Sequence, residues 1–286
     1  MDIHKLRIFA ESWNVAYRKK QKGVPLDRLE EPFIVIRNSF RYWAADPFLF
    51  EKDGDTYIFA ELYDYILARG VIGYLKLNAD KPRWIPIIRE RHHLSFPFIY
   101  EFNNEIFILP ESNESKTLYQ YRAVGFPDHW EKEEALLTNV RLVDTTPIKE
   151  NDYKKALTYD IDDESLKYID FSTKKIELLY SDPDGRKRPA GYINAKEGLR
   201  IAQKSEEDYG KGLILYQFDY SREQKYTESE MKIVSPQDVI LSPKIYLDGM
   251  HTYNQSDHYE VIDIKTRRFN ILNLGVRFFR KLRAFI

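Results

Sequence analysis

The sequence contains no cysteine among its 286 residues, and only 12 glycines and 13 prolines. The absence of cysteine excludes a disulfide framework, a thiolate metal site and a cysteine nucleophile. Apolar runs never reach the length of about 18 residues that a membrane-spanning helix needs. Lysine and arginine (44) nearly balance aspartate and glutamate (45), so no basic surface for nucleic acid is expected. The first twenty residues lack the apolar core of a signal peptide, and we therefore expect a soluble, cytoplasmic protein.

The sequence is rich in short β-type runs, and 15% of its residues are aromatic. These runs are separated by turn formers such as Asp53-Gly54, and they recur in units that open near positions 46, 96, 144, 190 and 250. Four short strands in each period of about 50 residues predict an all-β, five-bladed β-propeller. A β-sandwich is the alternative, but it gives no reason for the repeat. The apolar runs at residues 6–9 and 33–36 are predicted to complete the fifth blade and close the ring.

The C-terminal segment, residues 269–286, is predicted to be separate from the propeller of residues 1–268. After Asp263 the sequence has no acidic residue but seven basic ones: Lys265, Arg267, Arg268, Arg277, Arg280, Lys281 and Arg283. Apolar residues at 276, 279, 282 and 285 have helical spacing and predict a short basic amphipathic helix. Two interpretations stay open. The helix either binds the anionic inner face of a membrane, which would make the protein peripheral, or packs as a cap on the fold.

Polar residues that open successive units are expected to meet in the central channel, because the innermost strand of each blade lines it. The openings supply Asp46, Asp144, Arg188 and His251, and the strands that follow them supply Glu61, Glu111, Arg200 and Gln203. Acids in such apolar sequence must be paired or hydrogen-bonded if they are buried. Two carboxyl groups beside a sugar can divide the work of acid and base, and arginine suits a phosphate. A salt-bridge network between blades is the structural alternative.

Other chemical motifs are absent or better explained by turns. Neither His92-His93 nor His251 with His258 has the ligand spacing of a metal site, so no metal is predicted. Asp160-Ile161-Asp162 resembles a transferase metal motif, but its place between two strands favours a hairpin turn. No glycine-rich loop for a dinucleotide or nucleoside triphosphate occurs, nor a serine-hydrolase elbow, and we predict no cofactor.

A set of ordered motifs resembles one known family. They include Ala45-Asp46-Pro47-Phe48, Pro110-Glu111-Ser112, Asp144-Thr145-Thr146-Pro147, Arg188-Pro189-Ala190-Gly191, Arg200-Ile201-Ala202-Gln203 and His251-Thr252-Tyr253-Asn254. The pattern, over about residues 40 to 265, resembles the N-terminal domain of plant glucosamine inositolphosphorylceramide transferases and its bacterial relatives, a five-bladed propeller similar to glycoside hydrolase family 43. The resemblance implies a carbohydrate-active propeller in glycan or glycolipid assembly. Asp46 matches the hydrolase base, whereas the Glu-Gly-Pro motif that usually carries the acid is absent.

Three functions are therefore open. The first is a glycosyltransferase-like enzyme that uses a nucleotide- or lipid-linked sugar. In it Asp46 is the base, Glu111 or Asp144 the acid, and Arg188 and Arg200 hold phosphate. Gln203, His251 and Glu61 would bind the sugar. The second is a glycoside hydrolase resembling family 43, and the third is a glycan-binding partner of a separate transferase.

Overall fold

The computed structural model describes residues 9–206, 209–220 and 226–269. Within these ranges the regular elements are β-strands and three short 3-10 helices, Asn113–Ser115 (η2), Lys149–Asn151 (η3) and Pro236–Asp238 (η4). No helix in the described part of the chain is long and apolar enough to cross a membrane. The predicted all-β class is confirmed. The amphipathic helix predicted for residues 269–286 lies, apart from its first residue, outside the described residues.

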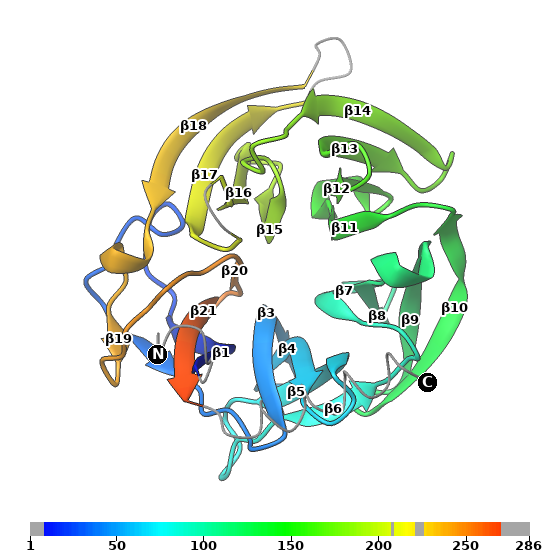
Figure 1. The fold of residues 1–286 in the computed structure, drawn as a ribbon. Coiled ribbons are helices and arrows are strands. Elements are labelled where there is room, and N and C mark those ends of the chain that lie inside the picture. Colours follow the sequence, from blue (N-terminus) through cyan, green and yellow to red (C-terminus); the bar gives the residue numbers. More distant parts are fainter. Residues whose placement is uncertain (1–8, 207–208, 221–225, 270–286) are drawn as a thin grey trace, which may run out of the picture.

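The strands form five blades arranged around a central axis (Figure 1). Each blade is a small antiparallel sheet whose first strand is innermost. Blade 1 contains β3 (Tyr42–Lys52), β4 (Asp55–Asp64), β5 (Arg69–Lys76) and β6 (Ile85–Ile88). Blade 2 contains β7 (Ser95–Phe102), β8 (Glu105–Glu111), β9 (Thr117–Gly125) and β10 (His129–Thr138). Blade 3 contains β11 (Leu142–Pro147), β12 (Lys155–Asp160), β13 (Ser165–Asp170) and β14 (Lys175–Ser181). Blade 4 contains β15 (Pro189–Asn194), β16 (Leu199–Lys204), β17 (Gly212–Asp219) and β18 (Thr227–Val234).

Blade 5 joins the two ends of the described chain. It contains β20 (Tyr253–Gln255), β21 (Tyr259–Phe269), β1 (Phe9–Lys19) and β2 (Phe33–Val35), and the short strand β19 (Leu241–Ser242) pairs with β2. β1 pairs antiparallel with β21 along all 11 of its residues. The predicted closure of the ring by N-terminal strands is therefore confirmed, with residues 6–8 of the predicted run outside the described part. The β1–β21 ladder joins the N-terminal strand to the C-terminal strand within blade 5 through backbone hydrogen bonds.

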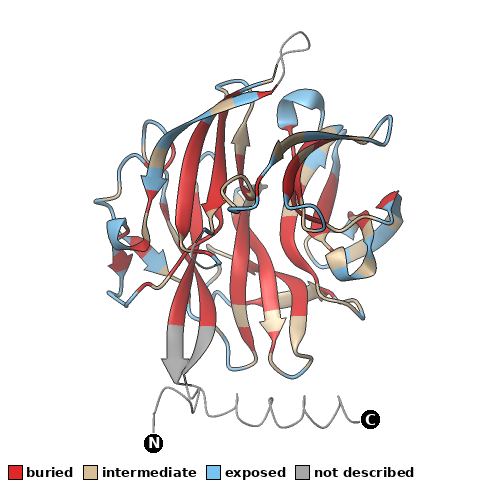
Figure 2. Cartoon of the chain, turned by 45° about the horizontal axis from the view of Figure 1, so that its top comes forward, coloured by how far each residue is buried: buried red, intermediate tan, exposed pale blue. Residues whose placement is uncertain are grey.

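The apolar core lies between neighbouring blades rather than at the centre of the ring. Phe48 and Phe59 of blade 1 pack with Phe96 of blade 2, and the ring centroids of Phe48 and Phe96 are 4.9 Å apart. A second cluster joins blade 4 to blade 5 and includes Leu213 and Phe33. Figure 2 shows the inner strands as largely buried. Because the apolar side chains fill these interfaces, the centre of the ring is left to polar groups.

A repeated β-bulge shapes the innermost strands of blades 1, 2 and 3. In each blade the inner strand has one more residue than its partner strand at this point. In blade 1, for example, Ala45 pairs with Glu61 and Phe48 pairs with Phe59, and the pairing shifts in the same way in blades 2 and 3. The bulged residues Asp46, Phe96 and Asp144 have φ values of +50°, +44° and +50°. Aspartate enters this left-handed region more readily than most residues. A bulge also redirects a side chain, and these bulges bring the side chains of Asp46 and Asp144 to the cavity lining.

Candidate functional site

A cavity of about 300 Å³ lies where the five blades meet. Its size is at the lower end of the range for small-molecule sites. It is lined by Trp13, Trp43, Ala45, Asp46, Glu61, Tyr63, His93, Ser95, Glu111, Asp144, Arg188, Tyr209 and His251. Six of the residues predicted from the sequence are among them. The structure thus brings together Asp46, Glu61, Glu111, Asp144, Arg188 and His251 from separate blades.

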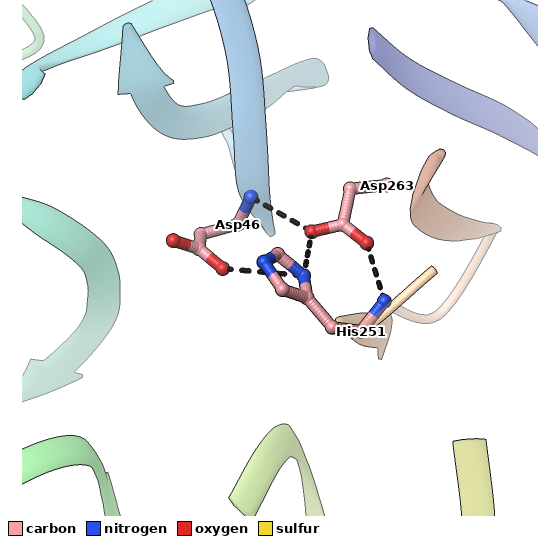
Figure 3. Close-up of side chains that lie close together, drawn as sticks. All are labelled: Asp46, His251 and Asp263. Atoms are coloured by element: carbon pink, nitrogen blue, oxygen red, sulfur yellow. Dashed lines mark hydrogen bonds and ion pairs between the residues drawn. The ribbon is translucent and has the colours of Figure 1, made fainter. Parts of the chain in front are cut away.

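The first wall of the cavity, called here the blade 1 wall, consists of Asp46 and His251 with Thr252 and Asp263 buried behind them. Figure 3 shows Asp46, His251 and Asp263. Asp263 lies on β21 and is completely buried. Its Oδ2 accepts the Asp46 N–H at 3.1 Å, and its Oδ1 accepts the N–H groups of His251 and Thr252 at 2.9 and 3.0 Å. Asp46 in turn accepts the Thr252 hydroxyl at 2.8 Å and the Phe96 N–H at 3.2 Å. This wall therefore holds its acids by neutral donors in addition to one histidine.

His251 is the only cation of this wall. Its Nδ1 is 2.5 Å from Asp263 Oδ2 and 3.8 Å from Asp46 Oδ1. The ring stacks on Trp13 with centroids 4.1 Å apart. Burial alone would lower the pKa of His251, but the carboxylates of Asp263 and Asp46 outweigh it and raise the pKa to about 9. The imidazole is therefore protonated at neutral pH and compensates one of the two adjacent acids.

A second wall, called here the blade 3 wall, consists of Glu111, Asp144 and Arg188, and the buried Gln203 supports it from behind. Arg188 Nε donates to Asp144 Oδ2, and Arg188 Nη2 is 3.8 Å from Glu111 Oε2. Gln203 Nε2 also donates to Asp144 Oδ2, at 2.9 Å. The bulge N–H of Asp144 points to Glu111 Oε2 at 3.4 Å. A guanidinium group therefore bridges two acids that come from different blades.

Two of the cavity acids have strongly raised pKa values. Burial raises the pKa of Asp46 to about 7; His251 opposes the rise, and the neighbouring carboxylates add to it. Burial and then Asp144 raise the pKa of Glu111 to about 8, although Arg188 acts in the opposite direction. Both carboxyl groups therefore keep their protons to a higher pH than ordinary carboxylic acids do, a property that general acids and bases need near neutral pH.

Glu61 forms a separate pair at the edge of the cavity. His93 Nδ1 accepts the Gly70 N–H at 3.0 Å, so the ring carries its proton on Nε2, which is 3.2 Å from Glu61 Oε1. The close approach needs glycine at position 70, because a Cβ atom there would lie 2.6 Å from Glu61 Oε1. Glu61 is thus held in place by His93, which the sequence analysis considered only as a metal ligand.

The structure does not bring Arg200 and Gln203 to the cavity surface. Arg200 is fully buried inside blade 4, where its Nη2 is 2.6 Å from Glu228 Oε2 and its Nε donates to Tyr226 at 2.9 Å. It therefore cannot take the phosphate-holding role expected for it. Gln203 is also buried, and its contribution is the hydrogen bond to Asp144.

Aromatic side chains surround the opening. Trp43 and Tyr63 stack with ring centroids 4.8 Å apart, and the Arg188 guanidinium lies 5.3 Å from the centroid of the Tyr209 ring. The sequence analysis did not single out Asp263, Trp13, Tyr63 or Tyr209 as site residues. Asp263 did carry a signal, because an acid between Ile262 and Ile264 has the same apolar context as Asp46 and Glu61. The Asp160–Asp163 motif lies in the turn between β12 and β13, as predicted.

One group of described residues has the geometry for a cation. Ligand atoms of Asp46, His251 and Asp263 lie within 4.8 Å of one another. Backbone N–H groups and a hydroxyl already donate to the oxygens of both acids. Donor hydrogens directed at these oxygens disfavour a positive ion there, so the donor set fits an ion pair with protonated His251 better than a metal site. The expectation that no metal binds stays a prediction.

Comparisons with known proteins identify the family. The model of the family described as "Glucosamine inositolphosphorylceramide transferase 1, N-terminal" matches residues 35–240. The protein named glucosamine inositolphosphorylceramide transferase 1 from Arabidopsis thaliana is 29% identical over 253 residues, which are 79% of this chain and 31% of that protein. Its counterpart from Oryza sativa subsp. indica is 26% identical over 205 residues, 65% of this chain and 27% of that protein. This chain therefore spans less than a third of the length of either relative.

Solved structures also align with the chain. A putative glycoside hydrolase from Bacteroides ovatus covers 78% of this chain and 86% of its own, with 10% identity and a TM-score of 0.49. The catalytic domain of a GH62 alpha-L-arabinofuranosidase from Coprinopsis cinerea covers 78% of this chain and 90% of its own, with 8% identity and a TM-score of 0.47. The family model, by contrast, matches well over half of the chain, and the protein belongs to the N-terminal domain family of glucosamine inositolphosphorylceramide transferase 1.

Proposed function

We propose that the cavity binds one sugar and that the protein acts as a glycosyltransferase-like enzyme on a sugar joined to phosphate. The observation that carries this proposal is the presence, in one cavity, of two buried carboxyl groups with raised pKa values, about 7 for Asp46 and about 8 for Glu111. When two carboxyl groups in one site have different surroundings, their pKa values differ, and one can act as the base while the other acts as the acid. Asp46 accepts the proton of the attacking hydroxyl, and Glu111 donates one to the leaving group.

Asp144 is less suited than Glu111 to donate a proton. Its Oδ2 is already occupied as the acceptor of hydrogen bonds from both Arg188 and Gln203. We therefore assign Asp144 to holding Arg188 in place. Arg188, which reaches the cavity and is partly exposed, is the group proposed to meet a phosphate. Arg200 is left out of this role because Glu228 already neutralises it.

The relatives' name indicates the chemistry worth testing first. It refers to transfer of glucosamine to a phosphorylated ceramide lipid, and a lipid acceptor fits the basic segment after Asp263. We therefore propose that the protein works at the cytoplasmic face of a membrane, with a nucleotide sugar as donor. The basic C-terminal segment contributes to membrane attachment in this proposal.

The test combines binding and turnover with matched variants. UDP-glucosamine and UDP-N-acetylglucosamine are titrated calorimetrically into the full chain. Product is then measured by mass spectrometry with vesicles that contain inositol phosphorylceramide. We expect Asp46→Asn and Glu111→Gln each to reduce turnover at least about 100-fold, the scale of acid–base catalysis, while donor binding persists. The control Asp162→Asn, in the exposed turn after β12, should retain wild-type turnover.

Other outcomes would replace the proposal. Release of sugar from chromogenic arabinosides or xylosides, with no binding of nucleotide sugars, would indicate a glycoside hydrolase. Sugar binding that survives the combined loss of Asp46, Glu111 and Asp144, with no turnover in the wild type, would indicate a non-catalytic glycan-binding partner. Unfolding of Asp46→Asn at room temperature would assign Asp46 to architecture instead of chemistry.

A further inference from the structure

A basic and apolar surface surrounds one side of the cavity opening. It consists of three loops at the same end of blade 1, residues 37–41, 64–69 and 89–91, and is called here the blade 1 rim. Asp64 joins the three loops into one surface, because its Oδ2 is 2.7 Å from Arg41 Nη2 and 3.5 Å from Arg89 Nη1. Arg69 also donates to the backbone oxygen of Arg91 at 3.0 Å. The three loops are therefore presented as a unit.

The exposed groups of the rim are of two kinds. Phe40 and Ile66 are 81% and 71% exposed, although they are large apolar residues. The charged residues of the three loops are Arg37, Arg41, Arg69, Arg89 and Arg91 with Asp64 and Glu90. Asp64 is fully buried beneath Arg41, and Glu90 is 3.1 Å from Lys132. The solvent-facing surface is therefore cationic with two projecting apolar side chains.

The rim lies at the end of the ring where the cavity opens. Trp43 and Tyr63, which line the cavity, are two and one residues away from Arg41 and Asp64 along β3 and β4. Asn38 in the first rim loop donates to the backbone oxygen of Trp13 at 2.6 Å, so the rim borders β1 as well. Figure 1 shows β3 beside β1 and β21. The rim therefore borders the cavity on its blade 1 side.

The chain after Asp263 leads toward the same end. β21 runs from Tyr259, close to the His258–Glu51 ion pair at the far end of the ring, to Phe269, and β1 pairs with it up to Phe9. The residues that follow Asp263 include seven lysines and arginines and no acid. The described end of β21 and the blade 1 rim therefore lie at the same end of the ring.

The loop between β12 and β13 in blade 3 has a more balanced charge. Its Asp162 pairs with Arg141 at 2.9 Å and its Asp163 pairs with Lys167 at 2.6 Å. The attraction of a flat anionic surface would therefore rest on the arginines of the blade 1 rim. Exposed aromatic and aliphatic side chains among arginines are suited to the boundary between lipid headgroups and acyl chains.

We propose that the blade 1 rim is a docking surface for an anionic lipid bilayer, with Phe40 and Ile66 inserted among the headgroups and the five rim arginines facing anionic lipids. This contact orients the cavity opening toward the bilayer. The proposal rests on the surface itself, and it does not require the proposed transferase activity.

The main test measures binding of the full chain to vesicles by co-sedimentation. Phosphatidylcholine vesicles that contain phosphatidylserine are compared with vesicles of phosphatidylcholine alone. The rim variant carries Phe40→Ser, Ile66→Ser, Arg37→Gln and Arg91→Gln, which leaves the Arg41–Asp64–Arg89 cluster in place. The control variant carries Leu178→Ser, Lys149→Gln and Lys196→Gln, which remove an exposed apolar residue and two exposed cations on other blades.

We expect the wild type and the control to bind the phosphatidylserine vesicles and the rim variant to lose at least tenfold in partition coefficient. Binding should weaken with added salt, because the arginine contribution is screened. Rim-variant binding equal to the wild type would mean that the C-terminal segment suffices, and it would overturn the proposal. Failure of the wild type to bind either vesicle would overturn it too, and would direct the search to an acidic protein partner.

A second measurement locates the contact. Phe40→Trp should be quenched by brominated lipids in phosphatidylserine vesicles, whereas Leu178→Trp should not, each relative to the wild-type fluorescence. Equal quenching of both variants, or of neither, would contradict docking through the rim. Unchanged circular dichroism melting curves for all variants exclude unfolding as the cause of lost binding.

Discussion

The blade 1 wall and the blade 3 wall each hold a pair of buried acids, and they do so by different means. In the blade 1 wall, backbone N–H groups, a hydroxyl and one histidine surround Asp46 and Asp263. In the blade 3 wall, one guanidinium group lies between Glu111 and Asp144. Backbone donors are fixed by the fold, whereas an arginine side chain can move toward a ligand. The blade 1 wall is therefore held rigidly, whereas the blade 3 wall is able to adapt to a ligand.

The largest effect should follow from removing the acceptor at the centre of the blade 1 wall. Asp263→Ala leaves three buried N–H groups, those of Asp46, His251 and Thr252, without their acceptor. We expect the free energy of unfolding to fall by about 4 kcal/mol, since each buried unsatisfied donor is costly. Urea denaturation measures it. Asp162→Ala, which removes an exposed ion pair, is the control and should cost less than about 0.5 kcal/mol. A similar small loss for Asp263→Ala would show that the blade 1 wall is not held by this residue.

A smaller loss is expected on the blade 3 wall. Arg188→Met removes the partner of two acids and should lower the free energy of unfolding by about 3 kcal/mol, because unpaired buried charges are costly. The pKa of Glu111 should rise above about 8, since the guanidinium group holds it down. Carboxyl carbon NMR follows that titration. Arg141→Met, whose partner Asp162 is exposed, serves as the comparison and should change neither quantity appreciably. If the pKa of Glu111 did not change, Arg188 would have no influence on the ionisation of Glu111, and this prediction would be wrong.

The pH dependence of stability connects the two walls. The raised pKa values of Asp46 and Glu111 mean that the native state binds more protons than the unfolded chain between about pH 4 and about pH 8. Stability should therefore fall as the pH rises through this window. Glu111→Gln removes one of the two groups with a raised pKa. The decrease in the free energy of unfolding between pH 5 and pH 8 should therefore be about 2 kcal/mol smaller in this variant than in the wild type. Urea midpoints at both pH values provide the measurement, and a variant that loses as much as the wild type would contradict the assignment.

The smallest effect concerns a single hydroxyl group. Thr252→Val removes the donor that lies 2.8 Å from Asp46 Oδ1 and should cost about 1 kcal/mol of stability. The pKa of Asp46 should rise further above its ordinary value, because the hydroxyl stabilises the ionised form. NMR titration of the Asp46 carboxyl carbon gives the shift. Thr173→Val, in the exposed turn before β14, is the control. A fall in the Asp46 pKa would refute the role given to this hydroxyl.

The sequence predicted which residues reach the cavity where the repeat determined the position, and it did not do so where the side of a strand mattered. Asp46 and Asp144 occupy the same bulge in two blades, so the repeat placed both of them. Arg200 and Gln203 are three residues apart on β16, and residues separated by an odd number point to opposite faces of a strand. Gln203 therefore turns toward Asp144, and Arg200 turns toward Glu228. The sequence motif that contains both residues does not reveal which of them faces the channel.

Strand periodicity and turn residues are local properties of the chain, so the amino-acid sequence is enough to predict the all-β class, the repeat of about 50 residues and the apolar neighbours of the acids. Which charges meet depends on how the blades pack together. Arg188 contacts acids from blades 2 and 3, and Asp263 receives N–H groups from blades 1 and 5. Such contacts join residues up to 217 positions apart. Their geometry depends on closure of the ring and on the direction of each bulge, which no local pattern specifies.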